Sequence, residues 1–270
     1  MRSPTAMPMS LPAYMRDGSE YDEFMSRIEL RHGEPSEIRR FFQKAVEAVS
    51  ERGLSLTFEP LEELARVNAA NRESWRPLIP LFDTRHGIDS NFSFCLVGRN
   101  GSGDIVATQA ARLYDWTSTE FETEAQSLRL FYAEPSRSKQ VKETCRVTAR
   151  SARNITGRVV FSGGGWYRPD YRKQWLSGLL PRISRVLAHA RWKSDFTISI
   201  MAEAVINGGM AARCGYTQIE YDVLLRDGPV GDVRCALVWM PTHQLRSDLL
   251  EFIGESVPEI GAEPRVGVMR

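Results

Sequence analysis

A run of glycines followed by a basic, aromatic segment is the part of the sequence best suited to chemistry. An apolar strand pattern at residues 158–162 leads into three glycines, residues 163–165, and a long helix pattern with basic side chains follows. Glycines let a ligand approach the backbone closely, and the first turn of a helix presents N–H groups without partners inside the helix. Such a junction can hold an anion such as a phosphate. The interval 168–193 holds seven Lys and Arg residues and one acid, Asp170, and is the chain's strongest local positive patch.

The other chemistry-bearing side chains have no catalytic or metal-binding spacing. No pair among His32, His86 and His189 has the separation of a metal site or a catalytic triad, so we expect no metal. The cysteines also lack metal-type or CxxC spacing, and we expect them to be buried free thiols of a reduced, cytoplasmic protein. They are Cys95, Cys145, Cys214 and Cys235.

The composition excludes two classes of partner. A formal charge of +1 and a pI near 7.7 give no general attraction to nucleic acid or to an anionic membrane. The sequence has no apolar run near the roughly 20 residues of a membrane span, and prolines and polar residues interrupt residues 1–16 where a signal peptide would be apolar. We therefore expect a cytoplasmic protein, with no nucleic acid or membrane among its partners.

The first half of the chain predicts helices and an antiparallel hairpin. Apolar residues recur at helical spacing over 36–52, alternate over 54–58, and a second helix is expected from Pro60 to about residue 74. Segments 92–98 and 104–114 flank Asn100-Gly101, a strong turn signal, and predict a hairpin. We read 116–138 as an insertion with a helix at 119–126, and 141–154 as helix.

The second half predicts a long helix, a strand, a second helix and a final hairpin. The helix after the glycines carries an apolar stripe, and we expect Arg182, Arg185 and Arg191 to form its solvated face. Pro181 predicts either a bend or a regular part that begins near Gly178. The remaining elements are a strand at 196–200, a helix at 203–213 capped by Gly215, a hairpin of 217–225 and 234–240, and a helix at 242–253.

This order of elements, with two local motifs, resembles the GNAT N-acetyltransferase superfamily over residues 54–240. Residues 169–177, PDYRKQWLS, look like that family's Arg-x-x-Gly-x-Gly acyl-CoA loop, and residues 211–216, AARCGY, look like its later helix that ends in Gly and an aromatic residue. The resemblance implies an α/β (α+β) fold with a mixed, mostly antiparallel central sheet flanked by helices, plus an N-terminal helical extension. We expect a disordered tail at 1–20, the extension at 21–53, the GNAT-like domain at 54–255 and a C-terminal tail at 256–270.

The resemblance also implies a donor site and a reaction. The loop would hold the pyrophosphate of acetyl-CoA or another acyl-CoA, and the acyl group would pass to an amine of an unknown acceptor. Trp175 and Ser177 stand where the family usually has glycines. The cofactor-binding residues carried over are Arg172, Lys173, Gln174, Trp175, Leu176, Ser177 and Gly178.

The catalytic residues remain unknown at this stage. The family often uses a tyrosine to protonate the leaving thiolate, and that position is Ala211 here. Glu203 and Asn207 either face the cleft or belong to a solvated helix start. The aromatic residues of the junction either line an acyl or acceptor pocket or pack over the helix. They are Trp166, Tyr167, Tyr171 and Trp175.

Two other functions stay open beside acyl transfer from CoA. One is a GNAT-like module without catalytic activity that binds or regulates, and the other is a transferase with a different acyl carrier. A separation of the strands at Val160 and Ile198 would favour a channel for pantetheine, whereas continuous pairing would favour the inactive module. The sequence leaves the oligomeric state open, a dimer included.

Overall fold

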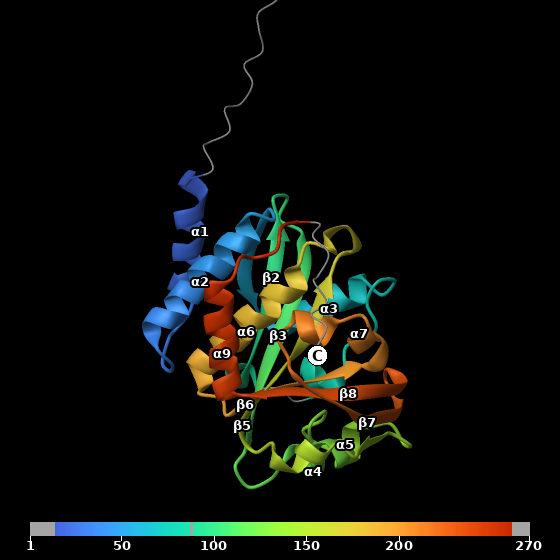
Figure 1. Cartoon of the computed structure of the whole chain (residues 1–270). Coiled ribbons are helices and arrows are strands. Elements are labelled where there is room, and N and C mark those ends of the chain that lie inside the picture. The colour runs from blue at the N-terminus through green and yellow to red at the C-terminus, as the bar shows by residue number, and fades with distance from the viewer. Residues whose placement is uncertain (1–13, 87–88, 261–270) are drawn as a thin grey trace, which may run out of the picture.

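The computed structural model describes residues 14–86 and 89–260 and contains a central sheet (Figure 1). Its strand order is β1-β2-β3-β5-β6-β8-β7-β4, and every neighbouring pair is antiparallel except β5 and β6. This mixed, mostly antiparallel sheet confirms the predicted fold class. The strands are β1 (Leu54–Glu59), β2 (Ser93–Asn100), β3 (Ile105–Trp116), β4 (Thr144–Val147), β5 (Gly157–Tyr167), β6 (Phe196–Ala202), β7 (Gln218–Gly228) and β8 (Gly231–Pro241).

Helices cover both faces of the sheet. The α-helices are α1 (Tyr14–Ser26), α2 (Pro35–Ser50), α3 (Leu61–Ala70), α4 (Phe121–Gln126), α5 (Pro135–Ser138), α6 (Leu176–Trp192), α7 (Glu203–Asn207), α8 (Met210–Arg213) and α9 (Thr242–Gly254). Short 3-10 turns are η1 (Pro80–Phe82), η2 (Thr84–His86), η3 (Ser90–Phe92), η4 (Arg150–Asn154) and η5 (Pro169–Tyr171).

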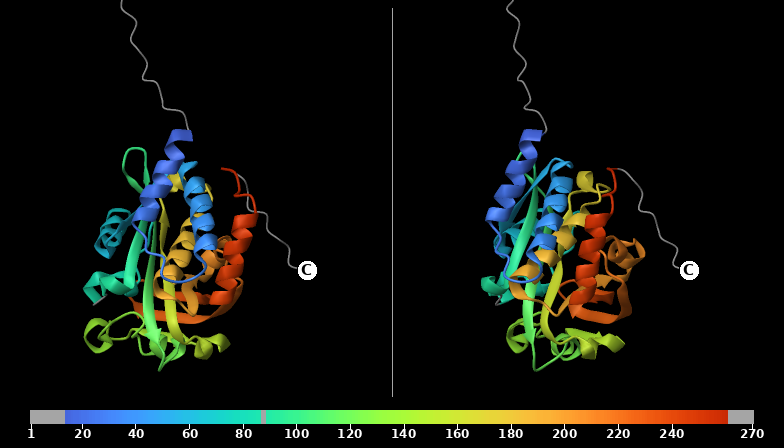
Figure 2. Two further views of the ribbon diagram at one scale, coloured as in Figure 1. Left: turned by 90° about the vertical axis from the view of Figure 1, so that its left-hand side faces the viewer. Right: turned by 60° about the vertical axis from the view of Figure 1, so that its left-hand side comes forward.

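Helix α6 lies at the centre of the larger helical layer. It packs on β3 and β5, and α2 and α9 cover its outer side (Figures 1 and 2). The apolar stripe of α2, with Phe41 and Phe42 fully buried, faces this layer. Helix α3 lies on the opposite face of the sheet from α9, where a second core contains Leu64, Phe82 and Phe161 (Figure 2). Apolar residues therefore fill both faces of the sheet.

The structure confirms both hairpins and corrects the interpretation of three segments. Residues 141–154 are not a helix, because Thr144–Val147 buries alternate side chains and pairs with β7, and η4 follows. The helix expected at 203–213 is divided into α7 and α8 by Gly208 and Gly209, and Gly209 adopts φ +76°. The second helix, α3, ends at Ala70, earlier than residue 74.

The expected tails are only partly covered by the described residues. Helix α1 begins at Tyr14, so residues 14–20 are helical, contrary to the predicted tail. Residues 1–13 of that tail lie outside the described residues. The C-terminal tail is described to residue 260, and 261–270 also lie outside.

Candidate functional site

The only parallel pair of the sheet in the described residues opens into a cleft. Strands β5 and β6 pair through Val159–Phe196, Val160–Thr197 and Phe161–Ile198, and then diverge. Beyond that point β5 stays paired with β3 as far as Tyr167, and β6 stays paired with β8 as far as Ala202. The sequence proposed Val160 and Ile198 as the place to look for a separation. Both are still paired, Val160 with Thr197 and Ile198 with Phe161, and the separation begins beyond Phe161 and Ile198.

A cavity of about 210 Å³, called the cleft from here on, lies between the diverging strands. Helix α6 closes it through Pro181, and the α7–α8 segment forms a second wall. None of the described residues that line it carries a carboxylate, an imidazole or a cationic group. The lining residues are Gln109, Ser162, Gly163, Gly164, Gly165, Tyr167, Pro181, Ser199, Ile200, Met201, Ala202, Val205, Met210, Cys214 and Tyr216.

The three glycines shape the cleft wall on β5. The β3–β5 register shifts between the pairs Ala110–Gly163 and Thr108–Trp166, so the strand bulges there, and Gly164 adopts φ +63°. A Cβ at Gly164 would lie within 3.2 Å of Leu64 and Ala110, which leaves no room for a side chain. Gly165 is different, because a Cβ there would point toward Gln109 Oε1 and the Tyr167 hydroxyl. The glycines therefore allow the strand to bulge and leave space in the cleft wall, and none of them lies at the helix start.

Buried hydroxyl and thiol groups at the cleft are neutral at ordinary pH. Burial raises the pKa of Tyr216 to about 12, although the Arg185 guanidinium acts against this shift. Burial also raises the pKa of the Cys214 thiol and holds the pKa of Tyr167 well above its usual value. Gln109 Nε2 donates to Ser162 Oγ at 3.0 Å, which fixes the amide. The cleft can thus donate hydrogen bonds without adding charge.

The predicted cofactor loop lies beyond the cleft and is held by backbone contacts. Arg172 is exposed and donates to the carbonyl oxygens of Tyr167 at 3.1 Å and Ser74 at 3.2 Å. The buried Arg52 donates from Nε to the Gln174 carbonyl at 2.6 Å and from Nη2 to the Pro258 carbonyl at 2.6 Å. Lys173 is exposed and adopts φ +64°. None of the seven predicted residues lines the cleft.

Trp175 determines the geometry at the start of α6. It precedes the helix with φ +59°, and its carbonyl accepts from the Gly178 N–H at 2.9 Å. Its ring lies against Gly178, where a Cβ would come within 2.4 Å of the indole, so only glycine fits. Leu176 is buried. Trp175 borders a second cavity of about 380 Å³, between the α8–β7 turn and α9, instead of the cleft.

Pro181 lies inside α6 without ending it. Proline has no N–H to donate to the carbonyl four residues earlier, which is Ser177. The Cys214 thiol takes that role and donates to the Ser177 carbonyl at 3.3 Å. Helix α6 begins at Leu176 and continues to Trp192, so of the two alternatives for Pro181 the start near Gly178 is wrong.

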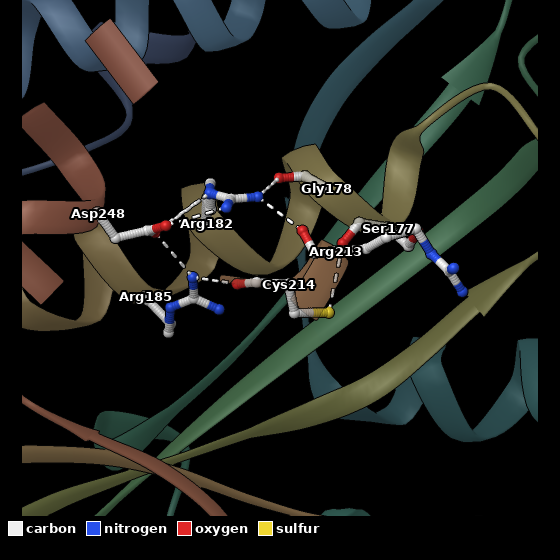
Figure 3. Close-up of polar contacts among 7 residues, drawn as sticks. All are labelled: Ser177, Gly178, Arg182, Arg185, Arg213, Cys214 and Asp248. Atoms are coloured by element: carbon white, nitrogen blue, oxygen red, sulfur yellow. Dashed lines mark hydrogen bonds and ion pairs between the residues drawn. The ribbon is translucent and has the colours of Figure 1, made fainter. Parts of the chain in front are cut away.

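Of the arginines predicted to be solvated, Arg185 is buried and Arg182 is half-buried, and both surround one carboxylate (Figure 3). Arg182 binds Asp248 through Nε and Nη2, and Arg185, which is 1% exposed, binds the same carboxylate at 3.1 Å. Arg182 also donates to the carbonyls of Gly178 and Arg213, and Arg185 donates to that of Cys214. These contacts join α6, α8 and α9 behind the cleft.

Most of the remaining candidates do not face the cleft. Glu203 pairs with Arg234 of β8 at 3.8 Å, Asn207 is exposed, and Ala211 is buried. Of the four junction aromatics, Tyr167 lines the cleft. Trp166 stacks on Trp75, Tyr171 packs against Arg168, and Trp175 stacks on Phe252.

The described residues contain no group of three or more His, Cys, Asp or Glu side chains that could hold a metal ion. All four cysteines are free and buried. No helix of the described part of the chain is long and apolar enough to cross a membrane.

Comparison with known proteins gives similarities of structure alone. No family model and no curated protein matches the sequence. A dodecameric spermidine N-acetyltransferase from Vibrio cholerae has a TM-score of 0.41 and 8% identity, over 71% of this chain and 95% of that chain. A Klebsiella pneumoniae protein described as an acyl-CoA N-acyltransferase has a TM-score of 0.38 and 14% identity, over 70% of this chain and 98% of that chain. At these values the similarity concerns the fold, and we draw nothing about activity from it.

Proposed function

We propose that this protein is an acyltransferase that moves an acyl group from an acyl-CoA thioester to an amine. The observation that carries the proposal is the divergence of β5 and β6 after Phe161 and Ile198. A strand edge without a partner leaves backbone N–H and C=O groups that need hydrogen bonds. The pantetheine arm of CoA is an extended chain with amide groups, and it can pair with an open strand edge as an added peptide strand does.

The size of the cleft limits which part of the donor it takes. Its volume of about 210 Å³ is below the roughly 300–1,000 Å³ of typical small-molecule sites. It suits the acyl group and the adjoining part of pantetheine. The nucleotide would then lie outside, over the start of α6, where the first N–H groups of the helix and the exposed Arg172 and Lys173 favour phosphate.

The acceptor half of the reaction needs a base, and the neutral cleft lining determines which base is available. An amine attacks a thioester only in its uncharged form, so a proton must leave it. Because the described lining residues include no carboxylate or imidazole, water at the open side of the cleft is the proposed base.

Calorimetric titration with acetyl-CoA and with S-acetylpantetheine tests the donor. We expect acetyl-CoA to bind and, at 100 times its Kd, to stabilise the fold by about 2.7 kcal/mol. S-acetylpantetheine lacks the nucleotide and should bind more weakly. Arg172→Ala and Lys173→Ala should each weaken acetyl-CoA and leave S-acetylpantetheine unchanged.

Each other outcome supports a different function. Equal affinity for the two donors would mean that the α6 start holds no phosphate, in favour of a different acyl carrier. That alternative has one observation behind it, because Trp175 stands where the resembled loop has glycine and its ring lies against Gly178. Binding of neither donor would contradict acyl transfer and favour a binding module. If acetyl-CoA binds, release of free thiol in the presence of a panel of primary amines then tests transfer.

A further inference from the structure

Three side chains that line the cleft carry a phenol or thiol proton: Tyr167, Cys214 and Tyr216. The position that the sequence assigned to a tyrosine acid is the buried Ala211. A thiolate that leaves a thioester nevertheless needs a proton or a strong hydrogen bond. Only a group that is accessible and whose proton is not already used in a hydrogen bond can protonate a ligand in the cleft.

The thiol proton of Cys214 is already used in a hydrogen bond within the fold. Its thiol donates to the Ser177 carbonyl, which has no helical donor because residue 181 is proline. Burial raises its pKa, and its side chain is 3% exposed. Proton donation to a ligand would leave the Ser177 carbonyl without a partner.

Tyr216 lines the cleft but is almost fully buried. It is 4% exposed, and its hydroxyl oxygen is buried without a hydrogen-bond partner among the described residues. The Arg185 guanidinium lies 4.9 Å from the ring centroid, and Arg185, Cys214 and Ser162 all affect the pKa of the hydroxyl. Because this oxygen is buried, it is less accessible to a ligand than the side chain of the partly buried Tyr167.

Tyr167 has the geometry that the other two lack. Trp166 packs on the far face of the sheet against Trp75, so Tyr167 points to the face that carries α6 and α8. Its side chain turns back along β5, and its hydroxyl lies 3.9 Å from the point where a Cβ at Gly165 would stand. Because Gly165 has no side chain, the hydroxyl occupies the cleft wall, and Tyr167 is only partly buried.

We propose that Tyr167 protonates the leaving sulfur when a thioester is cleaved in the cleft, an inference that rests on the proposed acyl transfer. The neutral amine forms a bond to the carbonyl carbon, and the C–S bond then breaks with its electron pair on sulfur. Sulfur takes the phenolic proton of Tyr167. The excess proton on the new amide nitrogen goes to water, and the phenolate takes a proton back from solvent.

The surroundings of Tyr167 agree with this role. Burial holds its pKa well above the usual value, so the phenol keeps its proton until the thiolate forms. The Arg213 guanidinium acts in the opposite direction and stabilises the transient phenolate. Met210 and Cys214, which precede and follow Ala211 in the sequence, also line the cleft. The phenol absent from α8 is thus supplied by β5.

The test compares Tyr167→Phe with Tyr221→Phe, a matched change at an exposed tyrosine of β7. With acetyl-CoA and a panel of primary amines, Tyr167→Phe should lower kcat about 100-fold and change KM for acetyl-CoA by less than about twofold. Tyr221→Phe should retain wild-type rates. With the acetyl thioester of an electron-poor aromatic thiol, whose thiolate leaves without a proton, Tyr167→Phe should equal the wild type.

Four results would overturn the assignment. Full activity of Tyr167→Phe with acetyl-CoA, or a large loss in Tyr216→Phe in its place, excludes Tyr167 and leaves acyl transfer standing. An equal loss with the aromatic thioester means that Tyr167 shapes the cleft without donating a proton. Failure of the wild type to bind acetyl-CoA removes the proposed function and this role together.

Discussion

At the scale of single residues, the decisive feature behind the cleft is that two guanidinium groups share one carboxylate. Arg185 is 1% exposed, Arg182 is largely buried, and Asp248 is the carboxylate that both contact. Removing one partner of a buried ion pair leaves a charge without compensation, which costs about 3–5 kcal/mol. We expect Asp248→Ala to lower the free energy of unfolding by that amount, as measured by urea denaturation.

An exposed ion pair that also involves α9, the helix that carries Asp248, provides the control. Arg246 of α9 binds Glu37 at 2.7 Å near the surface. Surface pairs contribute little, since solvent screens them, so Glu37→Ala should leave the urea midpoint nearly unchanged. If Asp248→Ala lowers the free energy of unfolding as little as Glu37→Ala does, the buried cluster does not stabilise the fold.

The sequence alone did not reveal this cluster, and the reason is physical. The periodicity of α6 shows one apolar stripe, and Arg182 and Arg185 lie beside it, as solvated residues normally do. The structure buries that side too, because α2 and α9 cover α6. One signal was available: Asp248 interrupts the apolar stripe of α9 formed by Leu245, Leu249 and Phe252. An acid on a buried stripe indicates a cationic partner on a neighbouring helix.

At the scale of elements, the start of α6 depends on a hydrogen bond that comes from outside the helix. The Cys214 thiol satisfies the Ser177 carbonyl in place of the N–H that Pro181 lacks. In Pro181→Ala the backbone N–H of residue 181 can take that carbonyl. We therefore expect Cys214→Ala to cost about 0.5–1.5 kcal/mol less in the Pro181→Ala background than in the wild type.

Urea unfolding of the four proteins of this double-mutant cycle measures the difference. The packing loss from Cys214→Ala is the same in both backgrounds, so it cancels in the cycle. An identical cost in both backgrounds would show that the thiol acts through packing alone.

The helices and strands were largely predictable from the sequence, but the places where they bulge or break were not. The hairpin around Asn100-Gly101 and the helix at α2 follow from turn chemistry and periodicity. The bulge at Gly164 depends on how β3 pairs with β5, and no pattern within residues 158–167 contains that register. The prediction of a single helix at 203–213 is wrong because it followed the apolar spacing and gave too little weight to Gly208 and Gly209.

At the scale of the whole molecule, the sheet consists of two halves that meet at one short seam. One half is β1-β2-β3-β5 and the other is β6-β8-β7-β4, joined by the pairs from Val159–Phe196 to Phe161–Ile198. The order of elements was enough to predict the fold class. The point at which two parallel strands part was not predictable, because apolar residues continue along β6 on both sides of Ile198.

This architecture predicts where a donor will change the exchange of backbone amides. In the free protein, residues 162–167 of β5 and 199–202 of β6 lack a strand partner on the cleft side, so part of their amides should exchange faster than those of the seam. Saturating acetyl-CoA should slow exchange in both segments, because its pantetheine arm would bridge the two halves. Hydrogen exchange with mass spectrometry measures this directly. The β1–β2 pair, none of whose residues lines the cleft, should not change. Slower exchange confined to the second cavity beside α9 would mean that the ligand binds there and that the diverging strands do not form the donor site.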